Sequence, residues 1–427
     1  MAESSTLNIS VKKIDVRFLM NAAAAAFITY LSMYAFRKPF TAATYDGLSL
    51  WGLDYKILLI ITQLIGYTIS KYVGIKLISE LHAGNRIRML IMLMGFAWVS
   101  LFFFAITPFP YNLPFIFLNG LPLGMIWGVV FGFLEGRKST ELLGAVMASS
   151  FIVSSGFVKT VAKWLQLTFH ISEKWIPFYT GMIFLIPVII LVFLLEKTPN
   201  PTSDDIQNKS ERLPTTKKER ITFFRQFKLG LIAFIVIYIL LTFFRDIRDN
   251  FAADIWIELG YGNNASIFTT TELPIAFCVL ILVASMIYVK NNKLAFQYSQ
   301  IIILAGFIIC GISTLLFSMQ FLSGYYWIVL VGLGLYMGYI PFNSILFDRM
   351  IAAFKLKGNV GYFMYLVDSF GYLASVFIIV FKGTMGVGIS WTLFYKNGVL
   401  LLSVIGSFIS ILTILYFNKK YKTYNYE

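Results

Sequence analysis

Charged side chains occur inside long apolar segments of this sequence. Arg37 lies in the first apolar segment and Arg245 in the seventh. An ionisable group near the middle of a bilayer costs at least ~2.5 kcal/mol, so such groups usually face an internal cavity and mark the path of a solute. The other charged residues that we single out inside apolar segments are Lys71, Lys159, Arg248, Asp249, Glu272 and Asp368.

Arg37 and Arg245 have the chemistry of anion ligands. A guanidinium is planar, stays protonated, and presents a fork of N–H donors that matches a phosphate or a carboxylate. Two arginines at matching places would form a symmetric clamp for an anion on a central axis. The predicted substrate site consists of Arg37, Arg245, Tyr34, Lys71 and Tyr238.

Neutralisation by a nearby carboxylate is the alternative role for each arginine. No carboxylate lies within one helical turn of Arg37, whereas Asp246 and Asp249 can pair with Arg245 and Arg248. Buried carboxylates can also take up protons, because burial disfavours their charged form. We therefore assign a role in ion coupling or in salt bridges to Glu272, Asp368, Asp249, Arg248 and Lys159. The pairings Lys71 with Glu272 and Lys159 with Asp368 are left open.

The composition indicates the elements that position these residues. Of the 427 residues 58% are hydrophobic and only 13% are charged, which is too little charge to cover a soluble protein of this length. The apolar residues come in blocks of ~20, the length that crosses a bilayer core. We predict an all-α polytopic membrane protein with about twelve spans. The polar residues before the first block and the lack of a cleavage site indicate a first span rather than a signal peptide.

Twelve spans are predicted in two sets of six, with a basic, proline-containing linker between them. The chain then divides into an N-terminal half at 1–195, a linker at 196–226 and a C-terminal half at 227–427. The predicted spans are Arg17–Thr41, Ile57–Ser79, Met89–Thr107, Leu113–Leu134, Leu142–Leu165, Ile176–Leu195, Phe227–Phe251, Ile267–Val289, Leu294–Ser318, Tyr325–Phe347, Asn359–Phe381 and Leu393–Phe417.

Basic residues cluster in alternate loops. If the N-terminus is cytoplasmic, the loops on that side hold most of the lysines and arginines, so both termini and the linker are predicted in the cytoplasm. The net charge of +14 is thus topological, and no nucleic-acid partner is expected. Short loops favour the inner membrane of a bacterium, with the lipid bilayer as the surrounding medium and a monomer as the expected state.

The two halves resemble each other. Gly120–Trp127 in the fourth span matches Gly332–Tyr339 in the tenth, and Tyr30 precedes Arg37 by the interval that separates Tyr238 from Arg245. Both matches share an offset near half the chain. This indicates a parallel repeat, the arrangement that alternating access between two like halves requires.

Enzymatic and cofactor chemistry find little support. The two cysteines and two histidines form no metal-ligand spacing, and no nucleophile–base pair can be placed. No phosphate-binding loop of the ATPase type is present, so direct drive by ATP is not expected. We predict neither a metal nor a cofactor and no enzyme activity.

Four stretches carry a family resemblance. Tyr34-Ala-Phe-Arg-Lys-Pro-Phe40 resembles the first-span element of the organophosphate:phosphate antiporters, the glycerol-3-phosphate transporter type of the major facilitator superfamily. Gly66-Tyr-Thr-Ile-Ser-Lys-Tyr72 and Phe370-Gly-Tyr-Leu-Ala-Ser375 are similar to its second- and eleventh-span elements. The stretch Tyr339–Arg349 resembles an uncharacterised bacterial branch close to that family. The resemblance implies that Arg37 and Arg245 hold a phosphate-like group, with Lys71 and Glu272 in the same cavity.

The leading hypothesis is a secondary active transporter that moves a small organic anion, an organophosphate or a phosphonate, through the two-arginine site. Either phosphate or protons would be the coupling ion, since Asp368 and the run Arg245–Asp249 are more charged than the family pattern. The alternatives are a proton-coupled transporter of a non-phosphorylated solute and a transporter-like membrane sensor.

Overall fold

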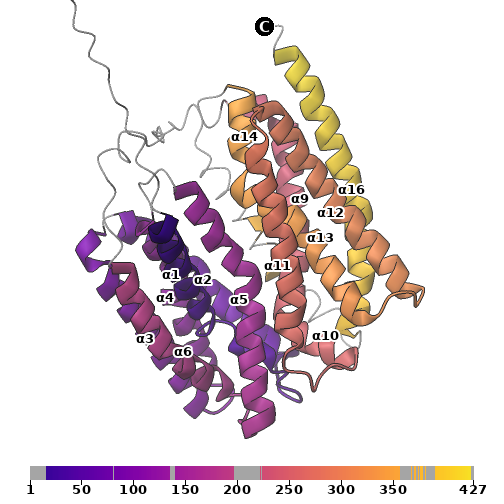
Figure 1. Ribbon diagram of the computed structural model, residues 1–427. Coiled ribbons are helices and arrows are strands. Elements are labelled where there is room, and N and C mark those ends of the chain that lie inside the picture. Colours follow the sequence, from indigo (N-terminus) through magenta and orange to yellow (C-terminus); the bar gives the residue numbers. More distant parts are fainter. Residues whose placement is uncertain are drawn as a thin grey trace, which may run out of the picture.

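The protein is described from a computed structural model, in which helices make up most of the described chain (Figure 1). The structure describes residues 16–79, 81–134, 140–196, 222, 224–355, 367, 370–371, 374, 376–377, 380 and 390–424. Its long helices are α1 (Val16–Tyr34), α2 (Tyr55–Ser79), α3 (Arg86–Ile106), α4 (Leu113–Gly132), α5 (Thr140–Phe169), α6 (Ile176–Glu196), α9 (Lys228–Asn250), α11 (Ile267–Ser285), α12 (Asn292–Ser318), α13 (Gly324–Ser344) and α16 (Trp391–Tyr424). The shorter elements are η1 (Pro39–Ala42), β1 (Ser49–Leu50), β2 (Leu53–Asp54), η2 (Ala83–Asn85), α10 (Ala252–Glu258), η3 (Met286–Tyr288) and α14 (Leu346–Ala353).

Nine helices among the described residues are long and apolar enough to cross a membrane: α2, α3, α4, α6, α9, α11, α12, α13 and α16. Helices satisfy their backbone hydrogen bonds internally, as a span in lipid must. Large apolar side chains are exposed on α6 and α16, with Ile186, Val404 and Phe408 all more than half exposed. Such a surface suits contact with lipid, so the chain is a multi-pass membrane protein.

The predicted first span, Arg17–Thr41, is wrong at its C-terminal end. Helix α1 stops at Tyr34 and a turn leads into η1, which begins at Pro39. Proline has no N–H to donate to the carbonyl of Ala35, and its ring clashes with that carbonyl in a continuous helix. Arg37 therefore lies in the turn that follows α1, and Thr41 lies in η1, so neither residue is on the helix that carries Tyr34.

Two other predictions, the bounds of the tenth span and the division of the chain into halves, have different outcomes. The tenth span, Tyr325–Phe347, is divided, because α13 ends at Ser344 and α14 begins at Leu346. Pro341 precedes this break and cannot donate a helical hydrogen bond. The linker lies almost wholly outside the described residues, as does most of the eleventh span, Asn359–Phe381, so the division into 1–195, 196–226 and 227–427 remains a prediction.

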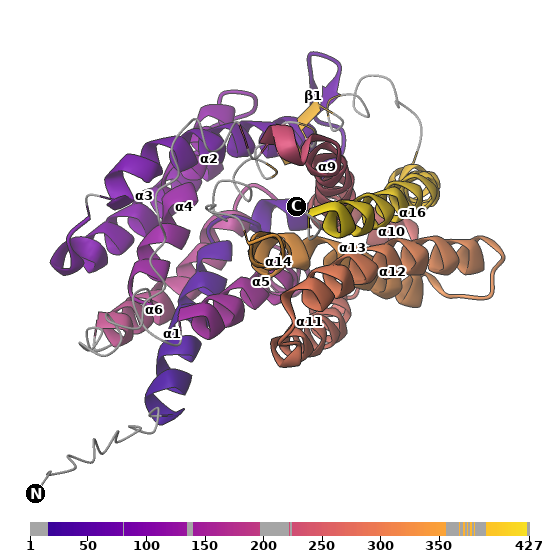
Figure 2. The same cartoon turned by 90° about the horizontal axis from the view of Figure 1, so that it is seen from above.

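The helices form two groups that lie side by side (Figures 1 and 2). We call α1–α6 the N-terminal group and α9–α16 the C-terminal group. Helices α5 and α11 pack against each other where the groups meet. In Figure 1 the groups are closest at the end that carries α10 and diverge toward the end that carries α14 and the C-terminus.

One end of the molecule holds the β1–β2 hairpin, α10 and the C-terminal ends of α1, α5 and α9. We call it the hairpin end. Lys56, at the start of α2, pairs with Asp254 of α10 there, at 2.6 Å between Nζ and Oδ2. The Thr269 hydroxyl of α11 donates to that of Thr160 on α5 at 2.7 Å. Within the described chain, the hydrogen bonds and ion pairs that join the groups lie toward this end.

The two sequence repeats meet in space. In the N-terminal group the Tyr30 ring of α1 packs on Trp127 of α4, with centroids 5.1 Å apart. In the C-terminal group Tyr238 of α9 packs on Tyr339 of α13, with centroids 5.2 Å apart. The first and fourth long helices of each group, α1 with α4 and α9 with α13, thus touch. The residues in contact are the ones that the repeat matches: Tyr30 with Tyr238, and Trp127 with Tyr339.

Candidate substrate site

Arg37 is held by its backbone at the end of α1. Because the helix stops before it, the carbonyls of Phe36 and Arg37 need other donors. The Gln63 amide of α2 donates to the Arg37 carbonyl at 3.0 Å, and the Asn119 amide of α4 donates to the Phe36 carbonyl at 2.9 Å. Gln63 also donates to the Asn119 side-chain oxygen at 2.8 Å. Two neighbouring helices therefore fix the turn that carries Arg37.

The Arg37 guanidinium stacks on a tyrosine. Its central carbon lies 4.0 Å from the ring centroid of Tyr67 on α2 and 5.9 Å from that of Tyr34. The Lys71 ammonium, one turn along α2, lies 5.2 Å from the same Tyr67 ring. The predicted residues Arg37, Tyr34 and Lys71 are thus brought together by Tyr67.

Arg245 has a similar stacking partner in the other group. Its guanidinium carbon lies 4.0 Å from the ring centroid of Tyr339 on α13. It also donates to Asp246, with 2.7 Å between Nη2 and Oδ1. Tyr238, predicted as a substrate residue, is fully buried beneath this stack against Tyr339. It therefore packs beneath the ring on which the Arg245 guanidinium stacks.

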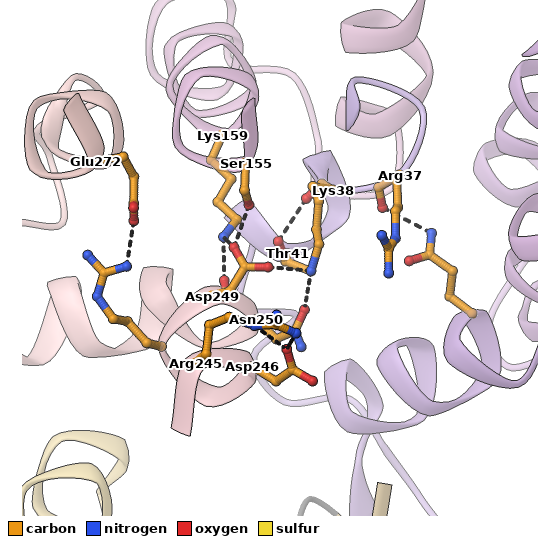
Figure 3. Close-up of polar contacts among 12 residues, drawn as sticks. Arg37, Lys38, Thr41, Ser155, Lys159, Arg245, Asp246, Asp249, Asn250 and Glu272 are labelled. Carbon is orange, nitrogen blue, oxygen red and sulfur yellow. Dashed lines mark hydrogen bonds and ion pairs between the residues drawn. The ribbon is translucent and has the colours of Figure 1, made fainter. Parts of the chain in front are cut away.

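Asp249 joins the two groups (Figure 3). One oxygen lies 2.5 Å from the Lys38 ammonium of the N-terminal group, and the other lies 2.6 Å from the ammonium of Lys159 on α5. The Ser155 hydroxyl of α5 donates to the second oxygen as well. Lys38 donates further to the Asn250 side chain at 2.8 Å. A single carboxylate thus holds two buried lysines from the opposite group.

Arg248 and Glu272 form an ion pair within the C-terminal group. Their nearest atoms, Nη1 and Oε1, are 2.7 Å apart, and the Arg248 Nε donates to the Ile328 carbonyl at 3.3 Å. Gly332 leaves the space for the guanidinium, because a Cβ there would lie 2.7 Å from its central carbon. Glu272 in turn faces α5, where a Cβ at Gly156 would lie 2.6 Å from its Cγ.

These charges act on one another as a single cluster. The Tyr34 hydroxyl lies within the field of Arg37, Arg245 and Asp249. The Tyr336 hydroxyl of α13 experiences the charges of Glu272, Asp249, Arg248 and Arg245. Long-range coupling of this kind requires a low local dielectric and short separations. Arg37, Arg245 and Asp249 therefore lie around the Tyr34 hydroxyl, whereas Arg245, Arg248, Asp249 and Glu272 lie around that of Tyr336.

The pairings differ in part from those considered above. Asp246 pairs with Arg245, but Asp249 pairs with Lys38 and Lys159 rather than with Arg248. Glu272 pairs with Arg248 and not with Lys71. Helix rotation decides these partners, because it sets which group each side chain faces. Asp368 lies outside the described residues.

Sequence reasoning missed Lys38, Tyr67 and Tyr339 as members of the site. Tyr67 precedes Lys71 by four residues and so shares its helix face, a spacing that pointed to it. Tyr339 is the last residue of the stretch that matches Gly120–Trp127, so the sequence repeat pointed to it. Nothing in the local sequence of Lys38 distinguishes an inward side chain from one that reaches the membrane surface.

Comparison with solved structures identifies the fold. Similar solved structures include a bacterial homologue of the human lysosomal transporter Spinster in an inward-facing, unoccupied conformation, with a TM-score of 0.58, 11% identity and coverage of 95% of this chain and 98% of that chain. The peptide transporter POT in complex with sulfate has a TM-score of 0.61 at 12% identity, covering 92% of this chain and 94% of that chain. A D-xylose–proton symporter has a TM-score of 0.59 at 12% identity, covering 92% and 96%. The fold is that of the major facilitator type.

The sequence family is narrower. Residues 39–420 match the model of a family of unknown function, DUF5690, and the chain belongs to that family. No curated protein matches the sequence significantly.

Proposed function

We propose that the protein is a secondary active transporter that moves a small organic anion of the organophosphate or phosphonate class by alternating access. Arg37 and Arg245 are the proposed anion ligands, and Tyr34 and Lys71 complete the site. Under the predicted topology the hairpin end faces outward. Its closed contacts then correspond to a conformation that opens toward the cytoplasm.

The arrangement of the two arginines carries this proposal. Each comes from the equivalent position of its group, and each guanidinium lies 4.0 Å from a tyrosine ring centroid. Stacking fixes the plane of a guanidinium and leaves the donors at its edge to point along that plane. Two such edges on opposite sides of one interface suit an oxyanion that both groups must hold during transport.

Charge balance also favours an anion. Among the described residues of the site, the cations Arg37, Lys38, Lys71, Lys159, Arg245 and Arg248 outnumber the carboxylates Asp246, Asp249 and Glu272. Like charges in a medium of low dielectric repel each other strongly. A bound anion would relieve that repulsion, and a cation would increase it.

A proton-coupled transporter of a non-phosphorylated solute is the second candidate. The Arg245–Asp246 pair favours it, because Asp246 occupies the Nε and Nη2 donors of Arg245 and its negative charge repels an anion that approaches them. A neutral solute has no such cost. The two candidates predict different ligands, so binding separates them.

Thermal stability with ligands tests the first candidate. We expect inorganic phosphate, a small phosphate monoester and methylphosphonate to raise the midpoint of thermal unfolding of the purified protein, since a ligand that binds the folded state stabilises it. Acetate and a neutral sugar serve as comparison ligands. Arg37→Lys and Arg245→Lys should each weaken the phosphate response about tenfold or more, because a lysine lacks the planar fork.

Arg349→Lys is the matched control. Arg349 donates to Asn292 at 2.7 Å near the opposite end of the molecule, so its substitution should leave the ligand response unchanged. An equal phosphate response in the wild type and in both site variants would refute the clamp. A response to the sugar alone would favour the second candidate.

A further inference from the structure

The Arg248–Glu272 pair contains two buried atoms without a hydrogen-bond partner. They are Nη2 of Arg248 and Oε2 of Glu272. The Arg248 side chain is only 5% exposed, and that of Glu272 is 15% exposed. An unsatisfied buried polar atom is costly unless a water or a proton completes its bonding. This pair therefore has chemistry that the anion site does not use.

A small cavity adjoins the pair. Lys159, Arg248, Thr271 and Glu272 contribute its polar lining, and Gly156, Phe268 and Ile328 contribute to its apolar part. Its volume is about 10 Å³, close to the minimum of about 10–15 Å³ that one water needs. Both residues line the cavity, so a water in it would lie beside the pair and would be placed to exchange a proton with the carboxylate.

Asp249 is a much poorer proton acceptor by geometry. Its oxygens receive donors from Lys38, Lys159 and Ser155. Hydrogen bonds and positive charges that favour the ionised form keep a carboxylate deprotonated. Protonation of Asp249 would break the contact that holds both lysines, whereas protonation of Glu272 on Oε2 breaks no hydrogen bond.

The charged and titratable groups around Glu272 come from four helices. Arg248 and Asp249 face it from α9, Lys159 from α5, Tyr336 from α13 and Tyr395 from α16. The two cations attract the ionised form, and Asp249 repels it. All of these side chains lie close to Glu272 in the described structure. Protonation of Glu272 therefore changes the electrostatic attraction between the two groups of helices.

We propose that Glu272 is the residue that binds and releases a coupling proton during transport. A hydronium in the cavity gives its proton to Oε2 and leaves a neutral water, and the carboxylate becomes a carboxylic acid. Arg248 keeps its bond to Oε1 and its bond to the Ile328 carbonyl. The proposal rests on the transport function above and names the ion that drives it.

Proton binding at Glu272 would be linked to the closed hairpin end. The residue sits on α11 where that helix crosses Gly156 of α5, and its negative charge attracts Lys159 of the opposite group. A proton removes this attraction. The protonated protein should therefore open more readily at the hairpin end than the ionised one.

Distance measurements between spin labels test this without a known substrate. Labels are placed on Tyr111→Cys and Phe321→Cys, at side chains that are 74% and 79% exposed in hairpin-end loops of the two groups. The native thiols are removed by Cys278→Ser and Cys310→Ala. In lipid nanodiscs, acidification from about pH 8 to about pH 5 should increase the population with the longer distance.

Glu272→Gln should lose this pH response and show the distance distribution of the acidified protein at every pH. Asp254→Asn is the control, since it removes another carboxylate that joins the groups, and it should keep the response. Glu272→Asp retains a carboxyl group, so a shifted response is expected if Glu272→Gln does not fold. An unchanged pH response in Glu272→Gln would overturn the proposal.

The anion site can fail independently. If Arg37→Lys abolishes the phosphate response but leaves the pH-dependent distance intact, the proton site stands on its own. A protein that shows no phosphate response at all but keeps the Glu272-dependent opening would retain the proton site and lose the proposed substrate class.

Discussion

The two faces that meet at the hairpin end have opposite chemical character. The N-terminal group contributes the buried cations Lys38, Lys56 and Lys159. The C-terminal group contributes Asp249 and Asp254 as their partners. The two groups are thus alike in their helices and in their arginines, yet one brings positive charge to the interface and the other brings carboxylates.

The same difference appears next to each arginine. Lys38 follows Arg37, whereas Asp246 follows Arg245 at the equivalent position and pairs with it at 2.7 Å. Equivalent positions in the two halves have diverged in charge while the arginines themselves agree. We infer that the arginines serve a ligand both halves share. Of the two diverged residues, Lys38 holds the halves together through Asp249, whereas Asp246 pairs within its own helix.

The largest effect is expected from Asp249→Asn. It leaves Lys38 and Lys159 buried without their shared carboxylate, and removal of one partner of a buried ion pair costs about 3–5 kcal/mol. We expect a clear fall in the midpoint of thermal unfolding. Asp246→Asn is the matched control, because that carboxylate pairs with a single arginine on its own helix. A fall no larger than that of the control would contradict the interface role.

Gly156→Ala should push the two groups of helices apart by steric overlap, without a change of charge. A Cβ at this position would lie 2.5 Å from the Phe268 carbonyl and 2.6 Å from the Glu272 Cγ. Overpacking of this kind typically costs about 1–3 kcal/mol. Label distances across the hairpin end should lengthen. Gly95→Ala has nothing within 4 Å of its added Cβ and should leave both distance and stability unchanged.

The spans and the repeat could be predicted from sequence because each rests on local pattern. Apolar blocks fix where helices cross, so α9 (Lys228–Asn250) lies within one residue of its predicted bounds at each end. The matching tyrosines indicated a repeat, and in the structure Tyr30 and Tyr238 make equivalent contacts with α4 and α13. Span positions depend on residues that are neighbours in the chain, and the repeat depends on a comparison of one half of the chain with the other.

The pairings could not be predicted, because they depend on how helices rotate and pack. Lys159 and Asp249 are separated by 90 residues, and no local pattern relates them. The end of α1 is different. Pro39 signalled a break there, but the composition of the segment suggested one long span, and the interpretation followed the composition. Asp368 falls outside the described residues and its role remains a prediction.

Gln63→Leu tests how Arg37 is positioned, in contrast to Arg245, which a continuous helix holds. The variant loses the amide that donates to the Arg37 carbonyl and to Asn119. An unsatisfied buried group costs about 1–3 kcal/mol, so phosphate affinity should fall about tenfold, as measured by the thermal response to phosphate. Gln300→Leu is the control, a buried glutamine that donates only within its own helix. Equal affinities in the two variants would remove Gln63 from the site.

Asp254→Asn should have the smallest effect, although Asp254 also pairs with a buried lysine across the interface. Burial raises the pKa of the Asp254 carboxyl above its usual value, and the attraction of Lys56 offsets only part of this rise. A carboxyl with a raised folded-state pKa contributes stability that is present at low pH and is lost as pH rises through that pKa. The unfolding midpoint of the wild type should therefore exceed that of Asp254→Asn mainly under acidic conditions, and the difference should shrink as the pH rises toward neutral. A deficit in the variant that grows with rising pH would show instead that the ionised Lys56–Asp254 pair holds the faces together as strongly as Asp249 does.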